Sequence, residues 1–508
     1  MAAGLIGGLT PLLAIWAKSP WPIALYLVGI GAISMIAVLV SAPLGDDTSA
    51  AETPPRPCGG WRRETERTRR KMTIDLDFTH VPGRKSWVAS ANDGATDFPL
   101  QNLPFCMFSR SGERRRAGVA IGDELLDLDA AAKLKLIDGE AAAALLACTG
   151  DNLDPVMAMA GPPATALRHR LSEVLASDHK ASSHASQLLV PQGDAQYHLP
   201  AAIGGFTDFF TSLYHTERGG RASRPDNPVP PNFRYMPIAY NSRASSVRIS
   251  GEEIRRPLGQ RRPSDGEVHF GPCESLDFEL ELGAFIGKAN ELGDPVDIGV
   301  AGDHVFGYCL LNDWSARDIQ RWESFPLGPF LAKTLSTSIS PFVVTSDALR
   351  PFRTVAAKRP DGDPAPLEYL NSERDQRLGG IDLRMEALIL TESMRSKGLE
   401  PHRVTSANFR DMYWTVAQMV AHHTINGCNL RVGDLIGSGT VSGPTDDSRA
   451  CLAEIVASGD AISLPNGERR TWLEDGDTVI FRAKAERDGY VSIGFGECTG
   501  RILPALSR

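Results

Sequence analysis

The chain has 508 residues, which is too long for one hydrophobic core and predicts two or more domains. Its formal net charge is −9, and Lys and Arg form no dense patch in the body of the chain, which argues against a nucleic-acid partner. The eight cysteines show no CxxC pair and no metal-type spacing, so we expect reduced, mostly buried thiols in a reducing compartment.

Residues 1–71 differ from the rest of the chain. Trp21 to Ala42 carries no charge and is about as long as one membrane-spanning helix. The basic run from Arg62 to Lys71 would then place the carboxyl side of that helix in the cytoplasm. A second interpretation stays open, because the Gly-, Ala- and Ile-rich stretch from Gly8 to Val40 resembles the last helices of a major-facilitator transporter. In that case the segment is a fused or misread neighbouring tail, and the catalytic body is cytoplasmic without an anchor.

Residues 85–199 are predicted to form a smaller amino-terminal domain. Arg116 to Leu128 predicts a β-hairpin, because Gly122-Asp123 supplies turn residues between two apolar runs. Ala130 to Ala147 and Thr165 to Ala176 have the composition and period of helices. The pattern alone indicates an α+β domain.

Residues 200–508 are dense in short apolar runs, Gly and Pro, which predicts a mixed and predominantly β domain. One longer helix is predicted from Asn408 to Thr424, ended by Asn426-Gly427. The predicted strands are Val247 to Ser250, Asp277 to Ile286, Val305 to Asn312, Leu383 to Leu390, Asp434 to Ser438 and Thr478 to Ala485.

Two of these strands carry acidic residues in a pattern that suits a metal ion. Apolar and acidic residues alternate from Leu276 to Gly283, so Glu279 and Glu281 share one face of a strand. Asp313 follows a buried strand, where a helix begins. Carboxylates arranged in this way can surround Ca²⁺ or Mg²⁺, which prefer oxygen ligands, and do not suit zinc.

Simpler interpretations of these acids stay open from the residues alone. Asp208, in Gly205 to Phe209, is typical of a helix N-cap. Glu279 and Glu281 suit the solvated face of a half-buried strand, and Asp313 suits the cap of the next helix. Four carboxylates gathered without a cation would also repel one another and raise their pKa values.

Several longer motifs resemble the fumarylacetoacetase family, and the resemblance covers most of the chain. The motifs are Phe98 to Phe105, Gly118 to Asp123, Gly205 to Phe209, Gly251 to Gly259, Leu276 to Gly283, Leu311 to Trp322, Gly494 to Cys498 and Ile502 to Leu506. The resemblance implies a small SH3-like barrel over 85–199 and a large mixed β-roll over 200–508, preceded by the membrane-helix-like segment. We therefore expect an α+β, predominantly β chain that forms a homodimer.

The resemblance also implies an activity, the hydrolysis of a carbon–carbon bond in fumarylacetoacetate to give fumarate and acetoacetate, which ends tyrosine and phenylalanine breakdown. One alternative is a related hydrolase, decarboxylase or isomerase that acts on another diketo or oxo acid. A second alternative is a membrane-tethered protein that only binds a metal or ligand. The full set of acid, base and lysine positions argues against that last alternative.

The resemblance assigns roles residue by residue. His215 matches the general base and Glu454 its acidic partner, while Lys333 and Gln320 assist the leaving carbanion. The metal set is Asp208, Glu279, Glu281 and Asp313, with Lys333 and Thr337 beside the ion. The substrate-binding positions are Arg224, Tyr240, Gln320, Thr440 and Phe210.

This chain departs from the family pattern at two aromatic positions and in one loop. Phe210 and Ser324 stand where tyrosines are usual, and Tyr214 to Gly220 differs from the commoner His-Ala-Thr-Asn-Val-Gly form. A lost hydroxyl can change which diketo acid is accepted. His422-His423 invites a metal interpretation, but we expect both to close the predicted helix and pack inside the protein.

Overall fold

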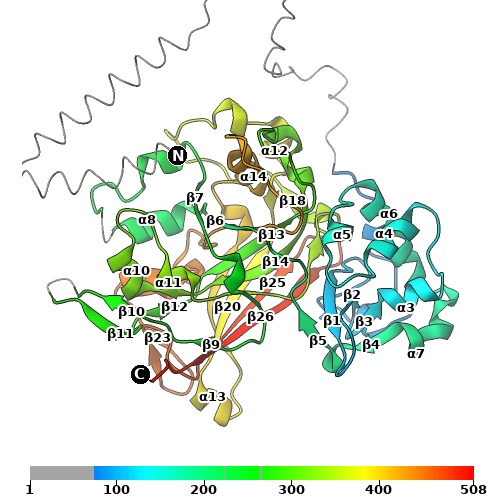
Figure 1. Ribbon diagram of the computed structural model, residues 1–508, viewed down its shortest axis with the longest axis horizontal. Helices are drawn as coiled ribbons and strands as arrows, with labels where there is room; N and C mark the ends of the chain where they lie inside the picture. The colour runs from blue at the N-terminus through cyan, green and yellow to red at the C-terminus, as the bar shows by residue number, and fades with distance from the viewer. Residues whose placement is uncertain (1–73, 222–223, 264–265, 508) are drawn as a thin grey trace, which may run out of the picture. The chain divides into compact units, whose positions relative to one another are not determined.

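The computed structural model describes residues 74–221, 224–263 and 266–507 (Figure 1). The chain divides into two compact units, residues 1–71 and 72–508. The predicted membrane helix and transporter-like tail lie outside the described residues. Within the described ranges, every helix is too short or too polar to cross a membrane.

A five-stranded antiparallel sheet forms the first part of the described chain. The predicted hairpin is confirmed, because β2 (Arg116–Ile121) pairs with β3 (Glu124–Asp127) around Gly122-Asp123. The strand order is β4-β3-β2-β1-β5, with β1 at Phe105–Ser109, β4 at Leu189–Pro191 and β5 at Gln196–His198.

Helices accompany this sheet (Figure 1). The single helix predicted over 130–147 is wrong, because the chain forms α3 (Leu128–Lys133) and α4 (Glu140–Ala147). Gly139, with φ 64°, lies between them in a backbone conformation that a helix interior does not allow. The second prediction is close to the observed α6 (Pro162–Val174).

The central sheet brings together segments that are distant in the sequence. Its neighbours β6 and β22 come from residues more than two hundred positions apart, and β22 runs parallel to β6 but antiparallel to β13. In spatial order the strands are β7 (Ile238–Asn241), β6 (Phe206–Phe210), β22 (Leu435–Gly437), β13 (Leu280–Ile286), β14 (Val305–Asp313), β16 (Thr337–Ile339) and β8 (Val247–Ile249).

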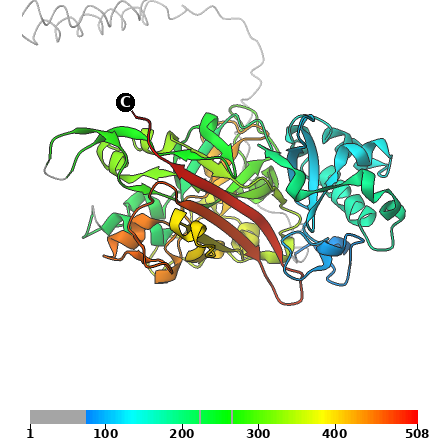
Figure 2. The same cartoon turned by 90° about the horizontal axis from the view of Figure 1, so that it is seen from below.

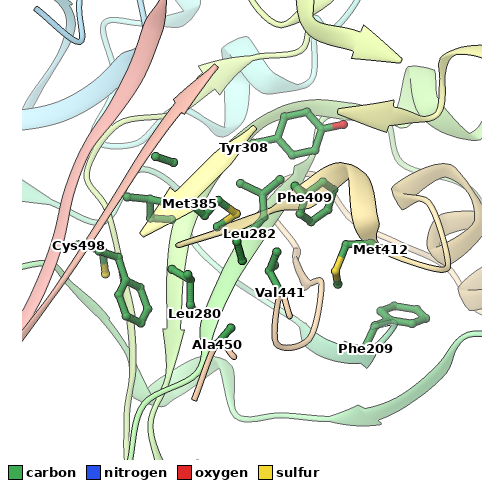
Figure 3. Packing of buried hydrophobic residues seen from close by; sticks show 14 of the residues in the cluster. Phe209, Leu280, Leu282, Tyr308, Met385, Phe409, Met412, Val441, Ala450 and Cys498 are labelled. Carbon is green, nitrogen blue, oxygen red and sulfur yellow. The ribbon is translucent and has the colours of Figure 1, made fainter. Parts of the chain in front are cut away.

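A second five-stranded sheet packs against the central sheet, and the apolar side chains between the two sheets form the main core. Figure 2 shows its long strand β26 (Ile493–Leu503) beside β25 (Thr478–Ala485), both coloured red. Side chains from the two sheets meet in one large apolar cluster, which includes Leu280, Leu282 and Met385 (Figure 3). The order is β21-β20-β25-β26-β9, with β21 at His402–Asn408, β20 at Arg384–Leu390 and β9 at Ile254–Arg255.

The expectation of a predominantly β fold is wrong, because the described chain is a mixed α/β structure. Many helices are too short for their period to be visible in the sequence, such as α10 (Arg317–Glu323), α11 (Leu331–Thr334) and α15 (Leu452–Ala457).

The predicted helix over 408–424 is shorter than expected. Its first residues belong to β21 and a 3₁₀ turn, and α14 (Val416–Thr424) starts where Thr415 and Gln418 form a capping box. The domain boundary at 199/200 stays a prediction.

Candidate active site

Four buried carboxylates meet at one end of the central sheet, and we call them the carboxylate cluster. Asp208 is in β6, Glu279 immediately precedes β13, Glu281 is in β13 and Asp313 ends β14. One carboxylate oxygen from each lies within 4.8 Å of the others, and all four residues are buried. The structure therefore brings together the four acids that the sequence singled out.

Strand register explains why these acids converge. In β13, Leu280 and Leu282 point into the main core while Glu281 faces the opposite side, where β22 places Gly437 beside Asp208. A Cβ atom on Gly437 would lie 2.4 Å from Asp208 Oδ1 and 3.1 Å from Glu281 Oε2. The absence of a side chain at Gly437 thus makes room for two carboxylates side by side.

Asp208 lies in a strand, so the N-cap interpretation of this residue is wrong. The strand β6 ends at Phe210, and α8 (Leu213–Arg221) begins after a short turn. His215 therefore follows Asp208 across a strand-to-helix junction. This geometry lets the two side chains approach the same region from different elements.

Lys333 supplies positive charge directly to the cluster. Its Nζ donates to Glu279 Oε2 at 2.5 Å and to Asp313 Oδ2 at 2.8 Å. Burial alone would lower the pKa of Lys333, but the charges of Asp313 and Glu279 outweigh burial and raise it. Thr337 Oγ1 lies 3.5 Å from Asp313 Oδ1. Lys333 is thus held as an ammonium group and balances part of the negative charge.

The positive charges of Lys333 and Arg317 do not balance all four acids of the cluster. Burial, reinforced by the charge of Asp313, raises the pKa of Asp208 well above its usual range, and burial with the charge of Asp208 does the same for Glu281. By contrast, Lys333 and Arg317 overcome the effect of burial on Glu279 and lower its pKa. Asp208 Oδ1 and Glu281 Oε1 are buried and have no hydrogen-bond donor. Two unpaired carboxylate oxygens among oxygen-only donors fit a hard divalent cation.

Tyr240 closes one side of the cluster. It lies opposite Asp208 in the β6–β7 pair, and its hydroxyl is 2.8 Å from Asp208 Oδ2 and 2.6 Å from Asp313 Oδ2. The hydroxyl has one proton, so it can donate to only one of these oxygens at a time. Tyr240 therefore belongs to the surroundings of the carboxylates as well as to the predicted substrate-binding set.

His215 and Glu454 form a second group, which we call the histidine pair. His215 Nδ1 lies 2.6 Å from Glu454 Oε1, and Glu454 lies on α15. The carboxylate of Glu454 also accepts hydrogen bonds from Ser442 Oγ at 2.5 Å and from Arg218 Nη1 at 3.0 Å. Burial raises the pKa of Glu454, but His215 and these donors outweigh it and lower the pKa. Glu454 is therefore ionised and can orient the imidazole.

The His215 ring links the two groups. Its Nδ1 faces Glu454, and its Nε2 lies 3.9 Å from Glu279 Oε1 in the carboxylate cluster. The Phe210 ring stands nearly edge-on to the imidazole, with the ring centroids 5.2 Å apart. A base oriented on one nitrogen and exposed to a reaction centre on the other is the arrangement expected for proton abstraction.

The remaining predicted residues divide by location. Gln320 lies on α10, and its Oε1 accepts from Arg317 Nη1 at 3.1 Å. Thr440 follows β22 and is buried with an unpaired hydroxyl. Arg224 is exposed and donates to the carbonyl of Pro228 at 3.0 Å, and none of its described contacts reaches the carboxylate cluster.

His422 and His423 lie at the end of α14, and neither belongs to the carboxylate cluster. His422 Nδ1 is 2.9 Å from the Tyr369 hydroxyl, and His423 Nε2 is 2.9 Å from Thr207 Oγ1. Thr207 precedes Asp208 in β6, so its side chain points to the opposite face of the sheet. These contacts match the expected packing role of both histidines.

Sequence reasoning missed two arginines. Buried Arg317 donates from Nε to Asp277 Oδ2 at 2.9 Å and from Nη2 to Glu279 Oε1 at 2.7 Å. Arg218 holds Glu454 from the helix that carries His215. Arg317 stands inside the Leu311 to Trp322 motif, which was the available signal. Its burial could not be read from the sequence, because an arginine at the start of a helix is usually exposed.

Comparisons with known proteins identify the family of this chain. The fumarylacetoacetase N-terminal family model matches residues 101–200, and the fumarylacetoacetate (FAA) hydrolase C-terminal model matches residues 206–503. The chain is 44% identical to the fumarylacetoacetase of Oryza sativa subsp. japonica, over 80% of this chain and 95% of that protein. It is 44% identical to that of Arabidopsis thaliana and 40% identical to that of Homo sapiens, each over 83% of this chain and 99% of the relative. The chain belongs to the fumarylacetoacetase family.

Proposed function

We propose that this protein hydrolyses the carbon–carbon bond of fumarylacetoacetate to give fumarate and acetoacetate, with the help of Ca²⁺ or Mg²⁺. The relatives that this chain matches over nearly their whole length carry the name of that activity. The observation that carries the proposal is the position of His215, oriented by Glu454 on one side and directed at the carboxylate cluster on the other. It supports the activation of water by His215 next to the four acids that would hold a cation.

Asp208, Glu279, Glu281 and Asp313 would hold the cation. The unpaired oxygens of Asp208 and Glu281 are available as ligands, whereas Lys333 is a donor and acts as a counter-charge next to the ion. A bound divalent cation supplies Lewis-acid polarisation of the two keto oxygens of the substrate. The hard oxygen donor set favours Ca²⁺ or Mg²⁺ over softer ions.

The histidine pair would activate water. Glu454 would accept a hydrogen bond from the Nδ1–H of His215, which leaves the lone pair of Nε2 free to take a proton from water. The resulting hydroxide forms a bond to the carbonyl carbon on the fumaryl side. The carbon–carbon bond then breaks, and its electron pair goes to the leaving enolate, which takes up the proton that His215 received from water and departs as acetoacetate. The acyl carbon departs as a carboxylate of fumarate.

Lys333 and Gln320 would stabilise the leaving enolate. Lys333 stays protonated because of its acidic neighbours, so it can stabilise negative charge but cannot act as a base. The Oε1 atom of Gln320 is occupied by Arg317, which leaves its amide NH₂ group to donate to the substrate. Tyr240, Thr440 and Arg224 are proposed to contact the substrate, and Phe210 would line the site beside His215.

A turnover assay tests this proposal. Mixing the full chain with fumarylacetoacetate and Mg²⁺ or Ca²⁺ should remove the ultraviolet absorbance of the diketo acid, and a chelator should stop the loss. A form that contains residues 72–508 should give the same kcat, because every proposed site residue lies in that part of the chain. An unchanged absorbance with both metals would contradict the proposal.

Phe210 and Ser324 favour a second candidate, a related reaction on another diketo acid. Phe210 has no hydroxyl, and the hydroxyl of Ser324 already donates to the backbone carbonyl of Gln320 at 2.6 Å. Neither side chain can therefore offer a substrate the hydrogen bond that a tyrosine would. Comparing kcat/KM for several diketo acids in the same assay distinguishes the two candidates.

A further inference from the structure

We propose that the histidine pair, together with Cys451, forms a binding site for Zn²⁺ that switches the enzyme off. This inference concerns a second metal site, separate from the carboxylate cluster, and it rests on the proposed function only for its effect on turnover. One ligand atom each from His215, Cys451 and Glu454 lies within 4.8 Å of the others. Imidazole nitrogen, thiolate sulfur and carboxylate oxygen are the donors that zinc prefers in proteins.

The distances suit a tetrahedral ion after a small adjustment. Cys451 Sγ lies 3.6 Å from Glu454 Oε1 and 3.9 Å from His215 Nδ1. Zinc bond lengths of about 2.0–2.3 Å place tetrahedral ligands about 3.3–3.6 Å apart. The separation between His215 Nδ1 and Glu454 Oε1 is 2.6 Å and must therefore widen, so that zinc replaces the hydrogen bond between the two side chains. Three protein ligands leave a fourth position for water.

The two metal sites differ in chemistry although they share one histidine ring. The carboxylate cluster offers oxygen atoms only and faces Nε2, whereas the site at Cys451 contains sulfur and faces Nδ1. Hard Ca²⁺ or Mg²⁺ binds poorly to thiolate, while zinc binds it well. We infer that the two ions occupy different sites at the same time and do not compete.

Zinc at this site would disable the base. In the proposed mechanism, Nδ1 carries the ring proton and donates a hydrogen bond to Glu454, so the lone pair of Nε2 is free. An ion on Nδ1 forces the proton of the neutral ring onto Nε2, which can then no longer accept a proton from water. Binding consumes one Zn²⁺ and releases one proton, from the thiol of Cys451, while the ring proton only changes nitrogen.

The first test is inhibition of turnover at a saturating concentration of Mg²⁺. Zn²⁺ should inhibit the full chain, and a tenfold increase in Mg²⁺ should not relieve the inhibition. Cys451→Ser should keep its Mg²⁺-supported turnover while the zinc concentration for half inhibition rises at least about tenfold, because losing a direct ligand costs at least what losing an outer-shell partner costs. Cys428→Ser is the matched control, since Cys428 is free and more exposed, and it should leave the inhibition unchanged.

The second test needs no turnover. Co²⁺ added to the Mg²⁺-loaded protein should give a near-ultraviolet thiolate-to-cobalt absorption band in the wild type and in Cys428→Ser, and Zn²⁺ should remove it. The band should be missing from Cys451→Ser and from Cys451→Ala. A band that persists in both variants, inhibition that Mg²⁺ relieves, or no inhibition at all would overturn the proposal. Because cobalt reports binding directly, the result stands even if fumarylacetoacetate is not the substrate.

Discussion

The histidine pair and the carboxylate cluster, which lie on either side of the His215 ring, balance their buried negative charge in different ways. In the histidine pair, both oxygens of Glu454 accept hydrogen bonds, from His215, Ser442 and Arg218, and the pKa of Glu454 is lowered. In the carboxylate cluster, Asp208 and Glu281 each keep an unpaired oxygen, and both pKa values are raised. Without a metal ion, the chain's own donors thus balance the charge of Glu454, whereas the charge of the carboxylate cluster needs a cation to balance it.

This comparison predicts that a side chain placed between the carboxylates of the cluster lowers kcat/KM more than any other change below. In Gly437→Ala, the new methyl group would lie 2.4 Å from Asp208 Oδ1, so the carboxylates must separate. We expect kcat/KM to fall at least about 10³-fold, which corresponds to losing the several kcal/mol that a catalytic metal supplies. Calorimetric titration should show weaker Ca²⁺ binding. Gly193→Ala, where nothing lies within 4 Å of the new Cβ, should behave like the wild type.

Removing the base should separate catalysis from metal binding. His215→Ala should lower kcat by about 10²-fold or more, the usual contribution of a general base. Ca²⁺ affinity should change little, because His215 is not among the four acids. His423→Ala is a suitable comparison, since that histidine contacts Thr207 on the opposite face of the sheet. Near-normal turnover of His215→Ala would remove this residue from the mechanism.

Removing the hydrogen bond from Arg218 to Glu454 should lower kcat less than removing His215 does. Arg218→Met removes the donor to Glu454 Oε2, and we expect kcat to fall about tenfold, or about 1.4 kcal/mol, with KM unchanged. Arg218→Lys should recover part of the loss. Arg221 lies on the same helix but pairs with half-buried Glu217, away from the histidine pair, so Arg221→Met should keep the wild-type kcat. A rise in KM without a fall in kcat would assign Arg218 to substrate binding instead.

The smallest predicted effect is on stability, and it depends on pH. Raised carboxyl pKa values mean that the protonated acids favour the folded state, so this stability is present at low pH and lost as the pH rises through the pKa values of Asp208 and Glu281. With a chelator, Tm should fall as the pH rises above the ordinary carboxyl range, by roughly 1 °C for each kcal/mol in a unit of this size. Saturating Ca²⁺ should remove this fall. Equal pH profiles with and without Ca²⁺ would contradict a cation at the cluster.

The sequence predicted the acids more reliably than their surroundings. Strand alternation placed Glu279 and Glu281 on one face, and the strand from Thr478 to Ala485 is confirmed with its exact bounds. Asp208 was ambiguous because a single acid before a helix suits an N-cap, and only its pairing with distant β22 shows the strand. Arg317 and Arg218 were missed for the same reason, since their partners lie far away in the sequence. The homodimer and the cytoplasmic location stay predictions.

The alternation of apolar and acidic side chains in β13 also disfavours an incorrect pairing of this strand. A slip of one residue in the pairing of β13 would turn Leu280 and Leu282 toward the carboxylates and bury Glu281 in the main core. An unpaired carboxylate in an apolar core costs several kcal/mol, so a shifted strand would be rejected as it formed. The acids that we assign to the cation thus have a second role, because they specify the register of the sheet even when no ion is bound.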